Sequence, residues 1–350
     1  MLVVLAVVPS LALIGLWAYT AEHMWTEASD LRDQNTISAK AGPSAYAVMV
    51  QLQQERRLSA AWLAGADSGT KAELDATRAR TDAALAEFTR MIGKLTDTDA
   101  NILDKARLIE ESRDLLPATR AQIDHRDGKR PDLLRLYNDA VQTQLTTFSA
   151  LSRVETDGNL THRSETLIDV FRAAEMTSRE DALLTYALGV GELGAAEYLD
   201  FAEAVGARRM LYGEQIEPNL EPRFVGAYRE MTSSRPWRAL VTAETAVLAM
   251  GVDGRPSQGL GLPPETADWR TTMDQVMTQI TAFNGQRAET IVEAAEKRVD
   301  DREFMVWLIT ALGLAVVAAV SLLCWGVTRS LRRRLMGLHH ATVELAQKRL

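Results

Sequence analysis

The stretch WLITALGLAVVAAVSLLCWGV, residues 307–327, decides how the rest of the chain is interpreted. It contains no charged residue and is long enough for a helix to cross the roughly 30 Å hydrocarbon core of a bilayer. The acidic flank DDRE (300–303) precedes it, and the basic segment TRSLRRR (328–334) follows. Because positive residues stay on the cytoplasmic side, the sequence predicts a transmembrane helix over 304–328 whose C-terminal end is cytoplasmic.

A second uncharged stretch, Leu2 to Tyr19, lies at the other end of the chain. It lacks the basic n-region and the small-residue cleavage site of a signal peptide, so we expect an uncleaved span over 1–21. Cleavage stays the open alternative. The two spans would enclose an extracytoplasmic module over 22–303 and leave 329–350 as the start of a cytoplasmic relay. This layout is typical of a membrane receptor located in the cell membrane as a multi-pass protein.

Composition narrows the function classes. The net charge is −8, although the segment from Arg329 onward holds six basic residues and one glutamate. The acidic excess therefore lies in the central part, which disfavours nucleic acid as a partner. The only cysteine, Cys324, lies in the apolar stretch, and the five histidines show no ligand spacing, so we expect neither metal nor cofactor. Without a nucleotide-binding glycine motif or a nucleophile–base pair, no catalytic residue and no catalytic domain is predicted.

The central part reads as an all-α fold. Residues 21–302 are rich in good helix formers and contain no alternating β-branched run. Clusters of Gly, Pro, Asp and Ser predict the breaks between helices. We expect up-and-down helical bundles, in two four-helix-like halves, flanked by the two transmembrane helices. The longest expected helices cover 43–64, 71–95, 101–126 and 131–188, the last with a kink near Asp157-Gly158, and a final helix runs from Glu265 into the second apolar stretch. The expected breaks are at 42–43, 65–69, 96–97, 127–131, 189–194, 218–222, 233–236 and 251–264.

The most distinctive local sequence is QLQQERRLS, residues 51–59. On a helix, Val48, Leu52, Ser59 and Leu63 share a face with Arg56, so its guanidinium is predicted to point toward the bundle interior. Arg57 faces about 100° away and is expected to be solvated.

A second arginine lies in a related setting, FRAAEMTSREDALLTYAL at 171–188, where Arg179 has Met176, Ala182 and Leu183 as helical neighbours. A glycine-bearing turn follows both arginine motifs, which leaves an internal duplication as an open possibility.

Two buried cations need a counter-charge. Two guanidinium groups about 5 Å apart repel by about 3 kcal/mol at an effective dielectric of 20, and a small anion between them would reverse this. The alternative is that each arginine pairs with an exposed carboxylate or reaches water. Arg56 and Arg179 are the candidate anion-binding residues, and the possible pocket lining is Leu52, Ser59, Met176, Ala182 and Leu183.

The QxERxLS pattern at 53–59, following an N-terminal span, resembles the nitrate- and nitrite-sensing (NIT) domain of bacterial receptors. The resemblance covers roughly residues 44–300. It implies a pair of up-and-down helical bundles that hold nitrate or nitrite between two arginines, one from each half. Arg56 matches the first, and SRExALL at 178–184 places Arg179 in the second role, although Ser178 stands where the first motif has Glu55. It also implies an actinobacterial-type sensor histidine kinase.

The segment 329–350 has leucines at three- and four-residue spacing, and it resembles the first helix of a HAMP linker. Ser330 stands where that family usually has proline. The alternative is a basic juxtamembrane helix that binds anionic lipid. The resemblance implies a homodimer and a longer protein, with a kinase domain beyond Leu350 that would act on a response regulator.

The sequence thus predicts a membrane receptor that senses nitrate, nitrite or a similar small anion in a two-component system. The alternatives are a helical receptor for another ligand or partner protein, and a scaffold bundle without a ligand.

Overall fold

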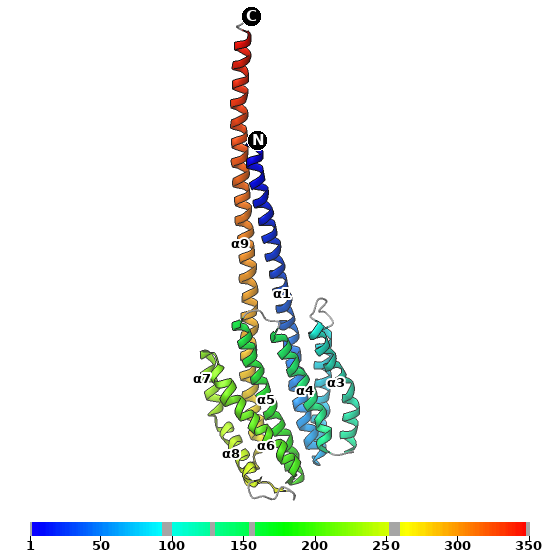
Figure 1. Cartoon of the computed structure of the whole chain (residues 1–350). Coiled ribbons are helices and arrows are strands. Elements are labelled where there is room, and N and C mark those ends of the chain that lie inside the picture. Colours follow the sequence, from blue (N-terminus) through cyan, green and yellow to red (C-terminus); the bar gives the residue numbers. More distant parts are fainter. Residues whose placement is uncertain (1, 93–99, 127–129, 154–157, 252–259, 348–350) are drawn as a thin grey trace. The chain divides into compact units, whose positions relative to one another are not determined.

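The computed structural model describes residues 2–92, 100–126, 130–153, 158–251 and 260–347, and these residues are almost entirely helical (Figure 1). The predicted all-α fold class is confirmed. The helices are α1 (Leu2–Leu63), α2 (Ser68–Ile92), α3 (Ala100–His125), α4 (Arg130–Arg153), α5 (Gly158–Val190), α6 (Ala195–Met210), α7 (Pro222–Thr232), α8 (Arg235–Met250) and α9 (Trp269–Gln347). Short segments join them: the π-helical η1 (Leu211–Ile216), the 3-10 turns η2 (Glu217–Asn219) and η4 (Pro264–Thr266), and the antiparallel strand pair β1 (Glu192–Leu193) and β2 (Leu260–Gly261).

The chain divides into two compact units. The central unit comprises Thr36–Ala295, and the terminal unit combines Met1–Asn35 with Glu296–Leu350. Helices α1 and α9 contribute residues to both units.

Two hydrophobic cores hold the central unit together. One is built mainly from α1, α2, α3 and α4, and it includes Phe171 and Ala182 from α5. The other is built from α5 to α9 and contains the buried Trp237 and Trp269. Helix α5 therefore faces both cores, which agrees with the expected two bundle-like halves.

Most of the described breaks fall where the sequence predicts them. Helix α8, for example, begins after Ser234, whose hydroxyl accepts a hydrogen bond from the backbone N–H of Trp237 at 3.2 Å. Residues 96–97, residues 127–129 of the break predicted at 127–131, residues 252–259 of the break predicted at 251–264, and the kink residue Asp157 lie outside the described residues.

Two predicted boundaries are wrong. Helix α1 continues through Gly42-Pro43, where a break was expected, because the turn that follows is anchored by buried side chains such as Ala45 and Val48. The expected helix over 131–188 is two helices, α4 and α5. They pack side by side in opposite directions, with Phe148 against Phe171 at a centroid distance of 5.3 Å.

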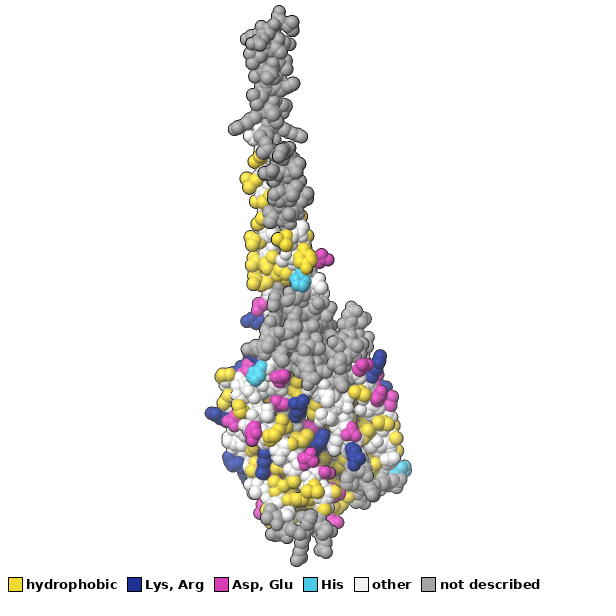
Figure 2. All heavy atoms as spheres, viewed as in Figure 1, with side chains coloured by type: hydrophobic (Ala, Val, Ile, Leu, Met, Phe, Trp, Pro, Cys, Tyr) yellow, Lys and Arg dark blue, Asp and Glu magenta, His cyan; other side chains and the backbone are white. Residues whose placement is uncertain are grey.

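The terminal unit contains the second apolar stretch. Most large apolar side chains described between Phe304 and Val327 on α9 are exposed, with Val306 as a buried exception (Figure 2). Among the described residues, α9 is the one helix with a window long and apolar enough to cross a membrane, with a mean hydropathy of 2.5. Within this unit, Trp25 of α1 meets Trp307 of α9 edge to face at 5.7 Å. The side chains of residues 1–13 lie outside the described ones, so the first span stays a prediction.

Gly189, near the end of α5, lies close to Ala64 in the turn after α1. A Cβ atom at this position would lie 2.5 Å from the Cβ of Ala64 and 3.3 Å from its carbonyl oxygen. We expect Gly189→Ala to destabilise the protein by about 1–3 kcal/mol because backbone must move to relieve the overlap. The matched control is Gly206→Ala in α6, where nothing lies within 4 Å of the added Cβ, and which should be neutral or stabilising. Urea unfolding measures both; equal stability of the two variants would contradict the close approach.

Candidate functional site

Arg56 lies on the buried face of α1. Val48, Leu52, Ser59 and Leu63 on the same face are at most 2% exposed, and Arg56 itself is 1% exposed. The predicted inward direction of this guanidinium is therefore confirmed. Because apolar and small residues recur on this face of α1, the charged side chain of Arg56 lies in the interior.

The guanidinium of Arg56 is almost fully hydrogen-bonded. It donates from Nη1 and Nη2 to the two carboxylate oxygens of Glu175 on α5, at 2.7 and 2.9 Å. Nη1 also donates to Oδ1 of Asn138 on α4 at 2.6 Å, and Nη2 to Oγ of Ser178 at 2.8 Å. Helices α1, α4 and α5 thus meet at this one side chain.

Arg179 reaches the same carboxylate. Its Nε donates to Oε1 of Glu175 at 2.7 Å, the oxygen that Nη1 of Arg56 also contacts. Gln53 donates from Nε2 to the other oxygen, Oε2, at 3.0 Å. Burial by itself would raise the pKa of Glu175, but Arg56 and then Arg179 outweigh burial and hold this pKa below its ordinary value. The structure therefore brings both predicted arginines together around one buried anion, which is a side chain of the protein.

Glu55 and Glu180, which are adjacent in sequence to Arg56 and Arg179, pair with other arginines. Arg120 of α3 donates to both oxygens of Glu55 at 2.8 and 2.9 Å, and the hydroxyl of Tyr137 donates at 2.8 Å. Glu180 accepts from Nε of Arg208 on α6 at 2.9 Å. Both carboxylates are fully buried, and each is hydrogen-bonded to an arginine of another helix rather than to its neighbour in sequence.

A cavity of about 270 Å³ lies beside the Arg56–Arg179 pair. A water molecule takes up about 30 Å³ in the liquid, so a small anion fits there together with water. Three arginines and two exposed carboxylates line it, and Glu175, which is hydrogen-bonded to Arg56 and Arg179, balances the third positive charge. The lining residues are Arg56, Leu134, Arg135, Asn138, Met176, Arg179, Ala182, Leu183, Asp200, Glu203 and Ala204.

The predicted lining residues divide into two groups. Met176, Ala182 and Leu183 border this cavity. Leu52 and Ser59 lie instead in the interior of the first bundle, where Oγ of Ser59 is 3.4 Å from the hydroxyl of Tyr137.

Sequence reasoning missed four polar residues of the site, namely Gln53, Asn138, Glu175 and Ser178. Glu175 was detectable, because a glutamate four residues before an arginine on a helix is the favourable order for an ion pair. Asn138 comes from another helix and had no signal.

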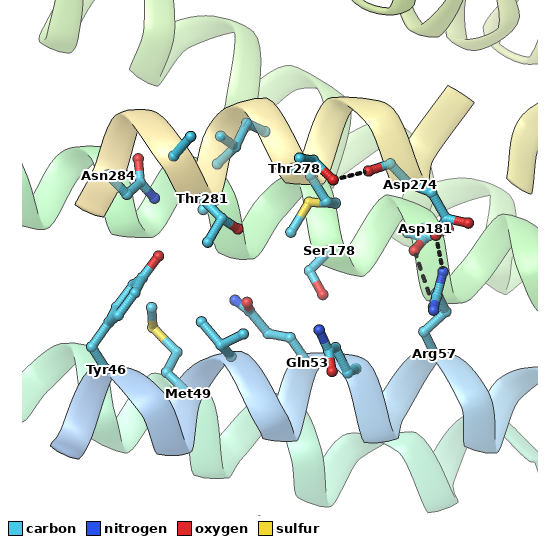
Figure 3. Close-up of a pocket in the computed structure, with 16 residues that line it drawn as sticks. Tyr46, Met49, Gln53, Arg57, Ser178, Asp181, Asp274, Thr278, Thr281 and Asn284 are labelled. Carbon is cyan, nitrogen blue, oxygen red and sulfur yellow. Dashed lines mark hydrogen bonds and ion pairs between the residues drawn. The ribbon is translucent and has the colours of Figure 1, made fainter. Parts of the chain in front are cut away.

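A larger cavity of about 600 Å³ lies between α1, α5 and α9 (Figure 3). Arg57 borders it and forms an ion pair with Asp274 of α9. Its Nε also lies 3.9 Å from Oδ2 of Asp181 on α5. The expectation that Arg57 is solvated is wrong: its side chain is 14% exposed, because α9 covers that face of α1. With two carboxylates around one paired arginine, this cavity is electrostatically unfavourable for an anion.

Three comparisons bear on this arrangement. The family model described as nitrate and nitrite sensing matches residues 47–292, a range that contains Arg56, Glu175 and Arg179. The chain is similar in fold to a solved structure described as that of the NasR transcription antiterminator, with a TM-score of 0.66 and 15% identity over 89% of this chain and 83% of that chain. At this identity the likeness concerns the fold alone. The comparison with curated proteins gives no match.

Proposed function

The chain belongs to the nitrate and nitrite sensing family, and we propose that its central unit binds nitrate, nitrite or a similar small anion between Arg56 and Arg179. The observation that carries this proposal is the meeting of the two guanidinium groups at Oε1 of Glu175, beside a cavity of about 270 Å³. Guanidinium forks bind planar oxyanions through two parallel hydrogen bonds, as Arg56 already binds the carboxylate of Glu175.

Glu175 acts in this proposal as an internal competitor of the ligand. An incoming anion replaces part of the carboxylate's contacts with the two arginines, while Gln53 keeps its hydrogen bond to Oε2. Asn138 and Ser178 hold the Arg56 guanidinium in place during the exchange. Such an exchange shifts α5 relative to α1 and thereby converts binding into a conformational signal.

The proposed output runs through α9. Asp181, three residues after Ser178 on α5, accepts a hydrogen bond from Nε1 of Trp269 at the start of α9, at 3.1 Å. Helix α9 continues without interruption to Gln347, through the apolar stretch. We propose that the chain is a multi-pass receptor of the cell membrane, with spans at 1–21 and 304–328 and an extracytoplasmic module over 22–303.

The remaining parts of the relay rest on the sequence resemblances. We propose that residues 329–350 form the start of a HAMP linker in a homodimer, and that this linker controls a histidine kinase and its response regulator.

A second candidate function is suggested by the larger cavity in Figure 3. About 600 Å³ is the volume of a site for an organic molecule rather than a three-atom or four-atom anion. Its carboxylates, Asp181 and Asp274, favour a ligand with hydrogen-bond donors. A thermal-shift screen of small organic compounds against the full chain tests this alternative.

Arg56→Gln tests the main proposal directly. We expect the variant to bind nitrate roughly 10- to 100-fold more weakly, because one charge-assisted hydrogen-bonding group is lost. Calorimetric titration of the purified full chain with nitrate and nitrite, with chloride as the comparison anion, measures the change.

The matched control is Arg57→Gln, which removes a neighbouring, equally charged side chain that borders the other cavity. It should keep nitrate affinity within about threefold, an order-of-magnitude allowance for indirect effects. No heat of binding at millimolar nitrate, or an equal loss in both variants, would contradict the proposed site.

A further inference from the structure

Glu175 of α5 is a buried carboxylate whose charge depends on four hydrogen bonds. Its Oε1 accepts from Nη1 of Arg56 and from Nε of Arg179, each at 2.7 Å. Its Oε2 accepts from Nη2 of Arg56 at 2.9 Å and from Nε2 of Gln53 at 3.0 Å. The residue is 0% exposed, so bulk water does not replace a donor that the carboxylate loses.

The charges around the adjacent cavity are balanced without a ligand. Among the described charged groups there, Glu175 is the buried carboxylate, and the other two carboxylates, on α6, are exposed. An added monoanion leaves one uncompensated negative charge, which is costly beside a buried carboxylate, and a proton on that carboxylate removes it. The groups that balance are Arg56, Arg135 and Arg179 on one side and Glu175, Asp200 and Glu203 on the other.

The other buried carboxylates of the neighbouring helices are engaged with different arginines. Those on α1 and α5 are Glu55, paired with Arg120, Glu180, paired with Arg208, and Asp181, beside Arg57; on α9, Asp274 is more exposed and also pairs with Arg57. Glu175 is therefore the carboxylate that shares its arginines with the proposed anion.

An incoming anion changes both conditions that keep Glu175 ionised. It takes N–H groups of Arg56 and Arg179 from the carboxylate, and it places a like charge next to it. Burial by itself raises the pKa of Glu175, and in the ligand-free protein Arg56 and then Arg179 outweigh burial. When the anion shares these arginines, burial and the second negative charge raise the pKa above that of the ligand-free protein.

We propose that the site binds its anion together with a proton, which Glu175 takes up from solvent. This coupling rests on the proposed function and adds the proton as a second ligand of the same site. One anion and one H⁺ enter, an O–H bond forms at the carboxylate, and the total charge around the cavity stays unchanged. The new O–H group is also a hydrogen-bond donor for the oxygens of the anion.

The direction of the pH effect follows from linkage. In the ligand-free protein the pKa of Glu175 lies below 4.5, so the carboxyl is ionised at higher pH and must gain its proton when the anion binds. A proton then strengthens anion binding by the same factor by which the anion strengthens proton binding. Nitrate does not titrate in this range. Its affinity should therefore decrease as the pH rises, by up to about tenfold per pH unit, the limit for one linked proton.

Calorimetric titration of the purified full chain with nitrate measures this coupling. The titrations are made between pH 5 and pH 8 at constant ionic strength, each in two buffers of different ionisation enthalpy. The difference in heat between the two buffers gives the number of protons taken up. We expect uptake of up to about one proton per nitrate, and a Kd that increases with pH over the same range.

Three variants assign the proton to its group. Glu175→Gln has no group to protonate, so its nitrate affinity should be independent of pH and its heat independent of the buffer. Gln53→Met removes the donor that stays with the carboxylate, so proton uptake should continue to higher pH than in the wild type. The matched control is Glu180→Gln, which alters a neighbouring, equally buried carboxyl that pairs with Arg208, and it should keep the uptake.

The outcomes distinguish this coupling from the site itself. Absence of nitrate binding at every pH overturns the proposed site and the coupling together. Nitrate binding whose affinity and heat are independent of pH and buffer overturns the coupling alone. So does proton uptake that persists in Glu175→Gln or is lost in Glu180→Gln. Gln53→Met decides where Glu175→Gln does not fold, because an unchanged pH range in that variant also excludes Glu175 as the proton acceptor.

Discussion

Glu175→Gln is expected to destabilise the protein by about 3–5 kcal/mol in the absence of anions, and nitrate is expected to restore much of this loss. The substitution removes the buried negative charge that neutralises Arg56 and Arg179, and breaking a buried ion pair from one side leaves an uncompensated charge. An anion that binds between the two arginines supplies the missing charge. At 100 times Kd its binding contributes about 2.7 kcal/mol to the free energy of unfolding.

The same variant should bind nitrate more tightly than the wild type, because the internal competitor no longer carries a charge. Urea unfolding with and without nitrate, together with calorimetric titration, measures both effects. The control is Glu203→Gln, which alters an exposed carboxylate at the same cavity and should change stability by no more than about 0.5 kcal/mol. If Glu175→Gln lost nitrate binding, the carboxylate would be part of the ligand site rather than a competitor for it.

The acid dependence of stability provides a second measurement on the same residue. The folded-state pKa of Glu175 lies below the ordinary value of 4.5. Its contribution to stability is therefore complete above pH 4.5 and is lost as the pH falls through the folded-state pKa. Glu175→Gln lacks this group, so its stability should decrease less between pH 4.5 and lower pH than that of the wild type.

Features of the site that depend on residues close together in sequence were predictable, and those that depend on contacts between distant helices were not. The inward direction of Arg56 follows from the spacing of Val48, Leu52, Ser59 and Leu63 on one helix, and such local periodicity is visible in a sequence. The convergence of Arg56 and Arg179 on Glu175 was not visible, because it depends on how α1 packs on α5. Only the Glu175–Arg179 half of it has the four-residue spacing that a sequence reveals.

Errors in the predicted fold have the same origin. Gly42-Pro43 has the composition of a helix break, but α1 continues because side chains beyond it are held in the core. Arg57 has the position of a solvated residue on α1, but Asp274 of α9, far away in sequence, pairs with it. In both cases tertiary contacts outweigh a correct local preference.

Arg208→Met is expected to destabilise the protein by about 3–5 kcal/mol at neutral pH and by less at acidic pH. Arg208 lies between Glu180 and Glu244, and both carboxylates are fully buried. Without the guanidinium these two groups repel each other in a medium of low dielectric, and only Arg209 remains as a partner, 3.0 Å from Oε2 of Glu244.

The pH dependence follows from the direction of the Glu180 pKa. Burial raises this pKa well above its ordinary value of 4.5, Arg208 opposes burial, and Glu244 adds to it. Removing Arg208 raises the pKa further. A carboxyl group with a raised folded-state pKa contributes its full stability below the unfolded-state pKa, and this contribution is lost as the pH rises toward the folded-state value. Because the wild type has a raised Glu180 pKa too, the deficit grows only where the carboxyl ionises in the wild type and stays protonated in the variant, and it should be larger at pH 8 than at pH 5.

The double variant Arg208→Met, Glu180→Gln separates the electrostatic cause from a packing defect. It removes the carboxyl of Glu180 and leaves Glu244 paired with Arg209. It should therefore be more stable than Arg208→Met at pH 8, and its stability should depend less on pH. Urea midpoints across the pH range measure both variants. An equal deficit of Arg208→Met at pH 5 and pH 8 would show that the loss comes from packing around Trp237, whose ring lies 5.4 Å from the guanidinium carbon, and not from the two carboxylates. If the loss of stability increases with pH only when Glu180 is present, this residue is the group that carries the proton in the buried cluster.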